Sequence, residues 1–162
     1  MSRRLPLHYW DSCTFINLIQ GQDPDNNGAL KNLIEHIKRG ELLIATSSLT
    51  LAEVVKPQRT TSRLTAADSN KIRDLFRLSS IRIFELTIPV AERAREIQWH
   101  LTVKPADAIH VATAESAKVL RFESFDDVLL GHLNAAPSSL WTHCPRFGHP
   151  VPLTGQLSIP TK

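Results

Sequence analysis

Four acidic residues lie far apart along this chain, and each is embedded in an apolar stretch. They are Asp11 in L-H-Y-W-D-S, Glu53 in S-S-L-T-L-A-E-V, Asp107 in K-P-A-D-A-I-H-V-A-T-A and Asp126 in F-E-S-F-D-D. Asp and Glu are rarely buried unless they are paired or bound to a metal ion. Carboxylates that converge repel one another unless a divalent cation neutralises them. The four acids therefore predict an Mg²⁺ or Mn²⁺ site, and they favour a metal-dependent phosphodiesterase.

A metal ion held by carboxylates suits the hydrolysis of a phosphodiester. The ion lowers the pKa of a water molecule and neutralises the phosphate, and two ions about 3.5–4 Å apart can stabilise both the attacking and the leaving oxygen. Hard oxygen ligands favour Mg²⁺ or Mn²⁺ over Zn²⁺. Such chemistry requires no Ser–His–Asp arrangement, and the sequence leaves open whether one ion or two are bound.

Composition sets the frame for such a site. A chain of 162 residues with 42% hydrophobic residues is long enough for one globular domain with a substantial core. The formal net charge is +3, from 19 Lys and Arg against 16 Asp and Glu, with a sequence pI of about 9.1. This mild surplus permits a polyanionic partner without requiring one.

The cellular compartment is predicted from cysteine usage and from hydropathy. Cys13 and Cys144 provide no disulfide framework, which favours a reducing compartment. The N-terminus has no apolar run typical of a signal peptide, and no stretch approaches the roughly 18 apolar residues of a membrane span. We therefore expect a cytoplasmic protein without a membrane partner.

Apolar runs and helical periodicities alternate along the chain. Strands are predicted at 7–10, 42–45, 81–86 and 119–122, and helices at 12–20, 28–40, 49–55, 65–78, 89–100 and 105–118. Regular alternation of strand and helix predicts a layered α/β fold with a mainly parallel sheet.

The C-terminal region has a different composition. Half of the ten prolines fall in residues 131–162, without helical or strand periodicity. We predict a domain over residues 1–130, followed by an extended or partly disordered extension that is not a separate domain. The extension contains His132, His143, Cys144 and His149, but their spacing matches no standard structural zinc site.

The predicted elements could deliver the four acids to one place. In an open parallel sheet, ligands bind beyond the carboxyl ends of the strands. Asp11 directly follows the first predicted strand, Asp126 follows the last, Glu53 comes about two helical turns after the second, and Asp107 lies in the first turn of a helix. Asp11 and Asp107 could instead be acids that stabilise a helix N-terminus. Glu53 has no basic neighbour before Lys56, so its carboxylate needs another explanation.

These acidic segments resemble the four motifs of the PIN-domain nucleases over roughly residues 5–130. In length and style the chain is most similar to the VapC-type toxins of bacterial toxin–antitoxin operons, and P-A-D-A-I-H-V-A-T-A is the most specific segment. The resemblance implies a three-layer α/β/α sandwich with a small, mainly parallel sheet. It also implies Mg²⁺- or Mn²⁺-dependent endoribonuclease activity on RNA, a homodimer, and inhibition by a small cognate antitoxin.

Site residues follow from the resemblance position by position. Asp11, Glu53 and Asp107 match the three central metal-binding acids of the family. The family usually has Thr or Ser two residues before its fourth acid, so Ser124 selects Asp126.

Three further residues near these motifs have open roles. Asp127 is adjacent to Asp126 and remains the alternative fourth acid. Ser12 and Ser124 could hold carboxylates or a bridging water by hydrogen bonds, although Ser12 could equally be only a helix cap.

Other side chains near the motifs have competing interpretations. Basic residues at the rim of an acidic pocket would attract RNA, and the candidates are Lys56, Arg59, Arg63 and Lys104, each of which could be only a solvated surface charge. His110 is better explained as a packed, hydrogen-bonded histidine than as a general base. Trp10, Trp99 and Trp141 could stack on bases, but Trp10 follows a strand into the core.

The four intact acids favour a catalytic protein over an inert scaffold. The main alternative is a catalytically weak or inactive PIN-like module that acts in RNA or protein binding. A third hypothesis is a nuclease that acts on DNA, or in RNA processing, without an antitoxin.

Overall fold

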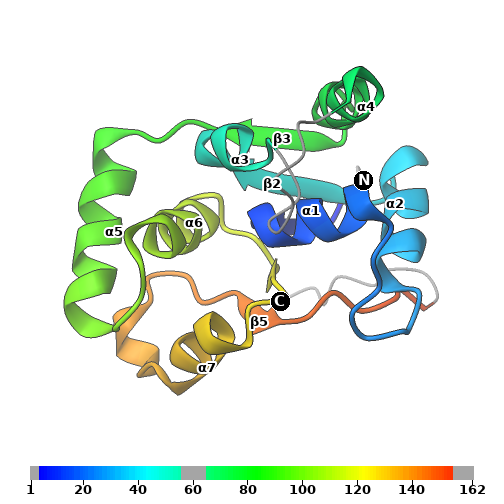
Figure 1. The fold of residues 1–162 in the computed structure, drawn as a ribbon. Coiled ribbons are helices and arrows are strands. Elements are labelled where there is room, and N and C mark those ends of the chain that lie inside the picture. Colours follow the sequence, from blue (N-terminus) through cyan, green and yellow to red (C-terminus); the bar gives the residue numbers. More distant parts are fainter. Residues whose placement is uncertain (1–3, 56–64, 155–162) are drawn as a thin grey trace.

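The computed structural model describes residues 4–55 and 65–154. Five parallel strands form one sheet in the order β3-β2-β1-β4-β5 (Figure 1). The strands are β1 (Leu7–Trp10), β2 (Leu43–Ser47), β3 (Ile81–Phe84), β4 (Arg121–Glu123) and β5 (Arg146–Gly148).

Helices connect the strands. They are α1 (Ser12–Gln20), α2 (Ala29–Lys38), α3 (Ser48–Glu53), α4 (Ala66–Phe76), α5 (Ile88–His100), α6 (Pro105–Ser116) and α7 (Asp127–Ala135), with a 3₁₀ turn η1 (Ser138–Leu140). Helices lie on both sides of the sheet, so the predicted three-layer α/β/α fold is confirmed (Figure 1). Among the described residues, no helix has the length and apolar character needed to cross a membrane.

Two cores form because successive side chains of a strand point to opposite faces of the sheet. Tyr9 is buried in the core beneath α5, α6 and α7, where its ring stacks on Phe122 with centroids 5.3 Å apart. The next residue, Trp10, is buried in the opposite core with Phe15 of α1 and Leu33 of α2. The expected burial of Trp10 is thus confirmed.

Polar residues at the strand ends start the helices that follow. The Asp11 side chain accepts from the Thr14 N–H and caps α1, and Ser47 caps α3 in the same way. Gly21 ends α1 in the left-handed conformation, at φ 65°, which a residue with a side chain rarely adopts. Helices α1 and α3 therefore begin directly after the strand ends, next to the candidate site residue Asp11 and to Ser47.

The prediction of a tail without regular structure is wrong for residues 131–154. Helix α7 crosses the expected boundary after residue 130, because Leu133 continues the buried face begun by Leu129 and Leu130. Strand β5 adds a fifth strand to the edge of the sheet, with Phe122 paired to Phe147. Three residues are too few to show a strand period, and nearby prolines are tolerated at a sheet edge.

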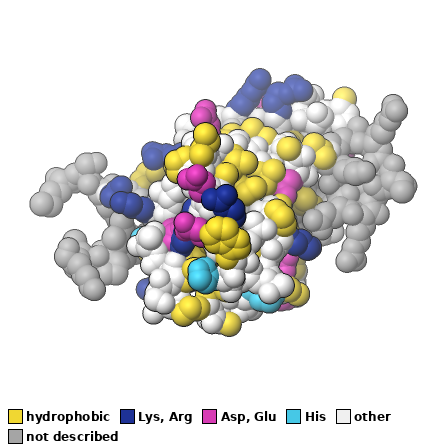
Figure 2. Space-filling model, turned by 90° about the vertical axis from the view of Figure 1, so that its left-hand side faces the viewer, with side chains coloured by type: hydrophobic (Ala, Val, Ile, Leu, Met, Phe, Trp, Pro, Cys, Tyr) yellow, Lys and Arg dark blue, Asp and Glu magenta, His cyan; other side chains and the backbone are white. Residues whose placement is uncertain are grey.

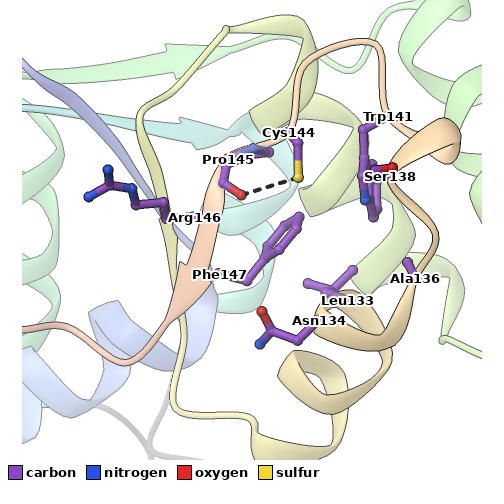
Figure 3. A pocket seen from close by; sticks show the side chains of 9 residues that line it. All are labelled: Leu133, Asn134, Ala136, Ser138, Trp141, Cys144, Pro145, Arg146 and Phe147. Atoms are coloured by element: carbon purple, nitrogen blue, oxygen red, sulfur yellow. Dashed lines mark hydrogen bonds between the residues drawn. The ribbon is translucent and has the colours of Figure 1, made fainter. Parts of the chain in front are cut away.

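Aromatic packing holds this region against the domain. The ring of Phe147 lies 5.3 Å from that of Trp141 and 5.9 Å from that of Phe122. Trp141, Phe147, Leu133 and Cys144 line an open hollow of about 310 Å³ between α7 and the segment before β5 (Figure 3). The region from α7 to β5 is therefore built into the domain.

Candidate active site at the carboxyl ends of the strands

The candidate site lies at the carboxyl ends of the strands, at the point where the strand order reverses. Strand β1 lies there between β2 and β4, and open parallel sheets bind ligands in the crevice at such a point. Trp10 pairs in register with Glu123, so the residues that follow them, Asp11 and Ser124, become neighbours. The Ser124 hydroxyl donates to Asp11 Oδ2 at 2.5 Å.

Asp11 is buried and surrounded by neutral donors. Its Oδ1 accepts from the Thr14 N–H and hydroxyl, both at 3.0 Å, and from Cys13 Sγ at 3.2 Å. Burial and the negative charge of Asp11 raise the pKa of the Cys13 thiol to about 12, which keeps it a neutral donor. A carboxylate has about four acceptor sites, so the oxygen bonded to Ser124 retains capacity for a cation.

Asp107 lies in the first turn of α6 and experiences both burial and repulsion. Burial and the charges of Asp126 and Asp11 raise the pKa of Asp107, and the charges of Lys104 and His110 only partly offset them. Asp11 and Asp126, from separate parts of the chain, are therefore near enough for their charges to act on Asp107.

Glu53 is the last residue of α3, with 28% of its side chain exposed. His110 Nε2 lies 2.7 Å from Glu53 Oε2. Burial alone would raise the pKa of Glu53, but hydrogen bonds from His110 and Ser12 and the charge of His110 lower it. His110 is buried and hydrogen-bonded, as expected. It is also the partner that Glu53 lacked in the sequence.

The two adjacent acids at the start of α7 point to different surroundings. Asp126 caps the helix through the Leu129 N–H at 2.9 Å, and its own N–H donates to Ser124 Oγ at 3.0 Å. Asp127 is 84% exposed and lies 2.8 Å from His149 Nε2. Only Asp126 of the two is among the charges that raise the pKa of Asp107.

The donor set fits a hard divalent ion in type and charge. Carboxylate oxygens are the ligands that Mg²⁺ and Mn²⁺ prefer, and the charges of Asp126 and Asp11 both raise the pKa of Asp107. Within the described ranges, however, no group of three or more His, Cys, Asp or Glu side chains is already arranged as a ligand shell. Binding an ion would therefore require side-chain rotation.

Several other candidates fall at or outside the rim. Lys104 is exposed and close enough for its charge to lower the pKa of Asp107. The other basic candidates, Lys56, Arg59 and Arg63, lie outside the described residues. The histidines of the C-terminal region are separated, because His143 contacts the Val119 carbonyl whereas His149 contacts acids.

Sequence reasoning missed three contributors to the site, namely Tyr9, Cys13 and Thr14. Thr14 and Cys13 are within one helical turn of Asp11, so helix geometry after a capping Asp could have identified them. Tyr9 reaches the site through His110, 101 residues away in sequence, and no local pattern indicates that contact.

A sequence profile described as PIN domain matches residues 9–131.

Among solved structures, the chain is similar to VapBC2 from Rickettsia felis bound to a DNA fragment from its promoter, with 14% identity, a TM-score of 0.62, and coverage of 87% of this chain and 96% of that one. It is similar to the sarcin–ricin loop cleaving toxin VapC20 of Mycobacterium tuberculosis, with 17% identity, a TM-score of 0.59, and coverage of 80% and 99%. It is also similar to PAE2754 from Pyrobaculum aerophilum, with 19% identity, a TM-score of 0.54, and coverage of 89% and 83%. These similarities are in the fold. None of the curated proteins matches.

Proposed function

This chain belongs to the PIN domain family, and we propose that it is a divalent-metal-dependent endoribonuclease acting as the toxin of a toxin–antitoxin pair. The observation that carries the proposal is the gathering of acids at the strand ends: Ser124 Oγ bonds both the Asp11 carboxylate and the Asp126 N–H, and the charges of both acids raise the pKa of Asp107. Acids gathered in this way cost folding free energy, and a site that binds a divalent ion explains why they are kept.

Each residue has a proposed role. Asp11, Glu53, Asp107 and Asp126 hold Mg²⁺ or Mn²⁺, and Ser124 orients Asp11 through its hydroxyl. When bound, the ion supplies positive charge for the phosphate and lowers the pKa of a nearby water.

The described residues around the site favour water as the nucleophile. The Cys13 thiol, whose pKa is about 12, is protonated near neutral pH. Burial and the charge of Asp11 likewise raise the pKa of Tyr9 well above its ordinary value, so its phenol also remains neutral. Lys104 is the described cation best placed to attract the phosphate backbone.

RNA is the proposed substrate and a cognate antitoxin the proposed partner. VapC20, which shares this fold, is described as cleaving the sarcin–ricin loop, and VapBC2 as bound to promoter DNA. Both partners would be met in the cytoplasm, where the free thiols Cys13 and Cys144 stay reduced.

A hollow between α3 and α4 is a candidate contact for the antitoxin. It has a volume of about 400 Å³, an apolar lining that includes Leu51, Ile72 and Phe76, and two arginines, Arg73 and Arg77. Apolar and acidic side chains on one segment would complement it. We expect Leu51→Arg to abolish co-purification with a small protein encoded beside this gene, and retention of that partner would contradict the assignment.

A stripe on α5 supports the proposed homodimer. Apolar side chains, Arg and acids share the face that α5 lines (Figure 2). Ile88 and Trp99 are 77% and 71% exposed, and Glu92 and Arg95 lie between them on the same side of the helix. A twofold axis crossing α5 between residues 93 and 94 would place Ile88 against Trp99, and Glu92 against Arg95, of the second copy. Such self-complementarity is what an isologous interface requires.

The dimer is tested by the mass of the protein in solution. We expect Trp99→Ala to shift light scattering from dimer toward monomer, whereas Leu120→Ala, which truncates an exposed apolar residue elsewhere, leaves the mass unchanged. A monomeric wild type, or a Trp99→Ala dimer of unchanged affinity, would reject this interface.

Cleavage of labelled RNA tests the catalytic proposal. Purified protein is incubated with RNA in Mg²⁺, in Mn²⁺ or in EDTA, and wild type is compared with Asp11→Asn and with Asp74→Asn, which alters an exposed acid on α4. We expect metal-dependent cleavage by wild type and Asp74→Asn only. Equal cleavage by Asp11→Asn, or insensitivity to EDTA, would sink the proposal.

The same assay separates the alternatives. An inactive binding module would retain RNA without cutting it, with Asp11→Asn binding as wild type does. DNA of the same sequence, used in parallel, would reveal a deoxyribonuclease.

A further inference from the structure

A chain of buried hydrogen bonds leads from the end of β2 to Glu53. The Ser47 N–H donates to Tyr9 Oη at 3.0 Å, Tyr9 Oη lies 2.8 Å from His110 Nδ1, and His110 Nε2 lies 2.7 Å from Glu53 Oε2. Tyr9 is fully buried and His110 is 2% exposed. Four elements, β2, β1, α6 and α3, thus meet through one backbone amide and three side chains.

When His110 is neutral, its partners determine the direction of each hydrogen bond. Tyr9 Oη already accepts from the Ser47 amide, so its own hydrogen is directed to His110 Nδ1. The imidazole then has its N–H at Nε2, where the Glu53 carboxylate can only accept. All donors point toward Glu53.

We propose that Tyr9 and His110 are positioning residues that fix the orientation of the Glu53 carboxylate for the metal ion. The inference rests on the proposed function, since it assigns the supporting shell of the same site. Metal-binding groups are commonly held by a second layer of hydrogen bonds. Removal of such a hydrogen bond lowers metal affinity or activity by roughly 10–100-fold.

Glu53 depends on such a support more than the other acids do. It ends a helix of six residues and is 28% exposed, whereas Asp11 is 6% exposed and receives four hydrogen bonds. Bonding to His110 occupies one acceptor position and leaves others on the carboxylate for an ion. Without His110, the Ser12 side chain would be the remaining donor to Glu53 among the described residues.

A purely structural role for Tyr9 and His110 makes a different prediction. Tyr9 stacks on Phe122 and His110 fills the core, so their loss could lower stability without affecting the ion. Tyr9→Phe keeps the ring and removes only the hydroxyl. Thr113→Val is the matched control, because it removes a buried hydroxyl from the same helix that contacts only the Ile109 carbonyl.

The test is a titration of purified protein with Mn²⁺, in which binding is measured by electron paramagnetic resonance. Each variant is studied at a temperature where it is folded. We expect Tyr9→Phe and His110→Leu to weaken Mn²⁺ binding by roughly 10–100-fold. His110→Gln should recover most of the loss, because its amide can donate to Glu53, and Thr113→Val should bind as wild type does. If His110→Leu fails to fold, Tyr9→Phe carries the comparison.

The outcomes separate this inference from the proposed function. Wild-type affinity in Tyr9→Phe, combined with weakened binding in Glu53→Gln, overturns the positioning role and leaves the metal site intact. Loss of affinity in Thr113→Val equal to that in Tyr9→Phe also overturns it, since destabilisation alone would then suffice. Absence of Mn²⁺ binding by wild type overturns both.

Discussion

Two groups of acids in the described part of the chain differ in whether an arginine pairs with them. Glu115 of α6 is 4% exposed and receives two bonds from Arg93, Nε to Oε2 at 2.6 Å and Nη2 to Oε1 at 3.1 Å. The Thr142 N–H adds a third at 2.7 Å. Burial opposes ionisation, but these bonds lower the pKa of Glu115.

Glu123 of β4 is satisfied in a similar way. It is fully buried, with Trp10 Nε1 at 2.7 Å and Arg121 Nε at 3.0 Å. His8 Nδ1 lies 3.2 Å away without a hydrogen-bonding orientation. An arginine therefore neutralises each of the two structural glutamates.

The acids at the strand ends contrast with these pairs. Asp11 has only neutral donors, and Asp107 lies near Asp126 and Asp11 with a raised pKa. Asp11 is 6% exposed and Glu115 is 4% exposed, so burial alone does not distinguish the groups. Within residues 4–55 and 65–154, an arginine at ion-pair distance does distinguish them, and we interpret the group without one as the functional group.

The largest expected effect is on catalysis by Asp107→Asn. Cleavage of RNA should fall by more than about 100-fold, because even supporting residues of a metal site contribute roughly 10–100-fold. Circular dichroism should show an intact fold. A variant that unfolds would instead identify Asp107 as a structural carboxylate.

The next largest effect is on the stability of the fold, and it concerns the acids that are paired with arginine. Glu115→Gln should lower the free energy of unfolding by about 2–4 kcal/mol, below the 3–5 kcal/mol of a fully buried pair because Arg93 is 20% exposed. For a chain of this length, the melting temperature should fall by roughly 4–16 °C. Glu96→Gln removes the exposed partner of the same arginine and should cost less than about 1 kcal/mol. Equal losses in the two variants would remove the basis of the comparison.

A smaller effect concerns pH in the absence of metal. Burial, and then the charge of Asp126, place the folded-state pKa of Asp107 above the value of about 3.9 in an unfolded chain. A carboxyl raised in this way favours folding below its unfolded pKa and loses that contribution as pH rises through its folded pKa.

Urea unfolding in EDTA at pH 4 and pH 7 measures this linkage. Relative to Asp107→Asn, wild type should lose stability between the two pH values. Added Mn²⁺ should then stabilise wild type alone, by mass action. A difference between the two proteins that does not change with pH would show that Asp107 is not under repulsion.

The smallest effect separates Asp126 from its neighbour. Asp127 has a cation partner in His149, which also contacts Asp25. Burial opposes protonation of His149, but hydrogen bonds to both acids raise its pKa. This contribution is present below the unfolded pKa of about 6.5 and is lost as pH rises through the higher folded pKa.

Asp127→Asn should therefore cost about 0–1 kcal/mol near pH 6 and nothing near pH 9, because the pair is largely exposed. Its Mn²⁺ affinity should equal that of wild type, whereas Asp126→Asn should lose Mn²⁺ binding. The reverse pattern in a Mn²⁺ titration would make Asp127 the fourth acid.

Local chemistry made much of this fold predictable. A short apolar run followed by a polar cap marked the ends of β1 and β2, at Asp11 and Ser47, and proline marked the start of α6. Because the carboxyl ends of parallel strands share an edge, the place of the acids followed from the order of the elements.

Contacts between distant residues were not predictable in the same way. Strand β5 has three residues and depends on aromatic packing by Phe147. His110 and Glu53 are 57 residues apart. Glu115 meets Arg93 through the packing of α6 on α5, and it meets Thr142 through the segment that follows η1. Sequence periodicity indicates which side of a helix or strand is apolar. It does not indicate which polar group lies on the element that packs against it.

Calorimetric titration of Mn²⁺ tests the central claim most directly, with wild type, Asp107→Asn and Glu115→Gln compared at neutral pH. We predict that wild type and folded Glu115→Gln bind Mn²⁺ with similar affinity and that Asp107→Asn does not bind. Binding by Asp107→Asn that matches wild type, or no binding by wild type, would contradict the assignment of the acids without a described arginine partner to a metal site.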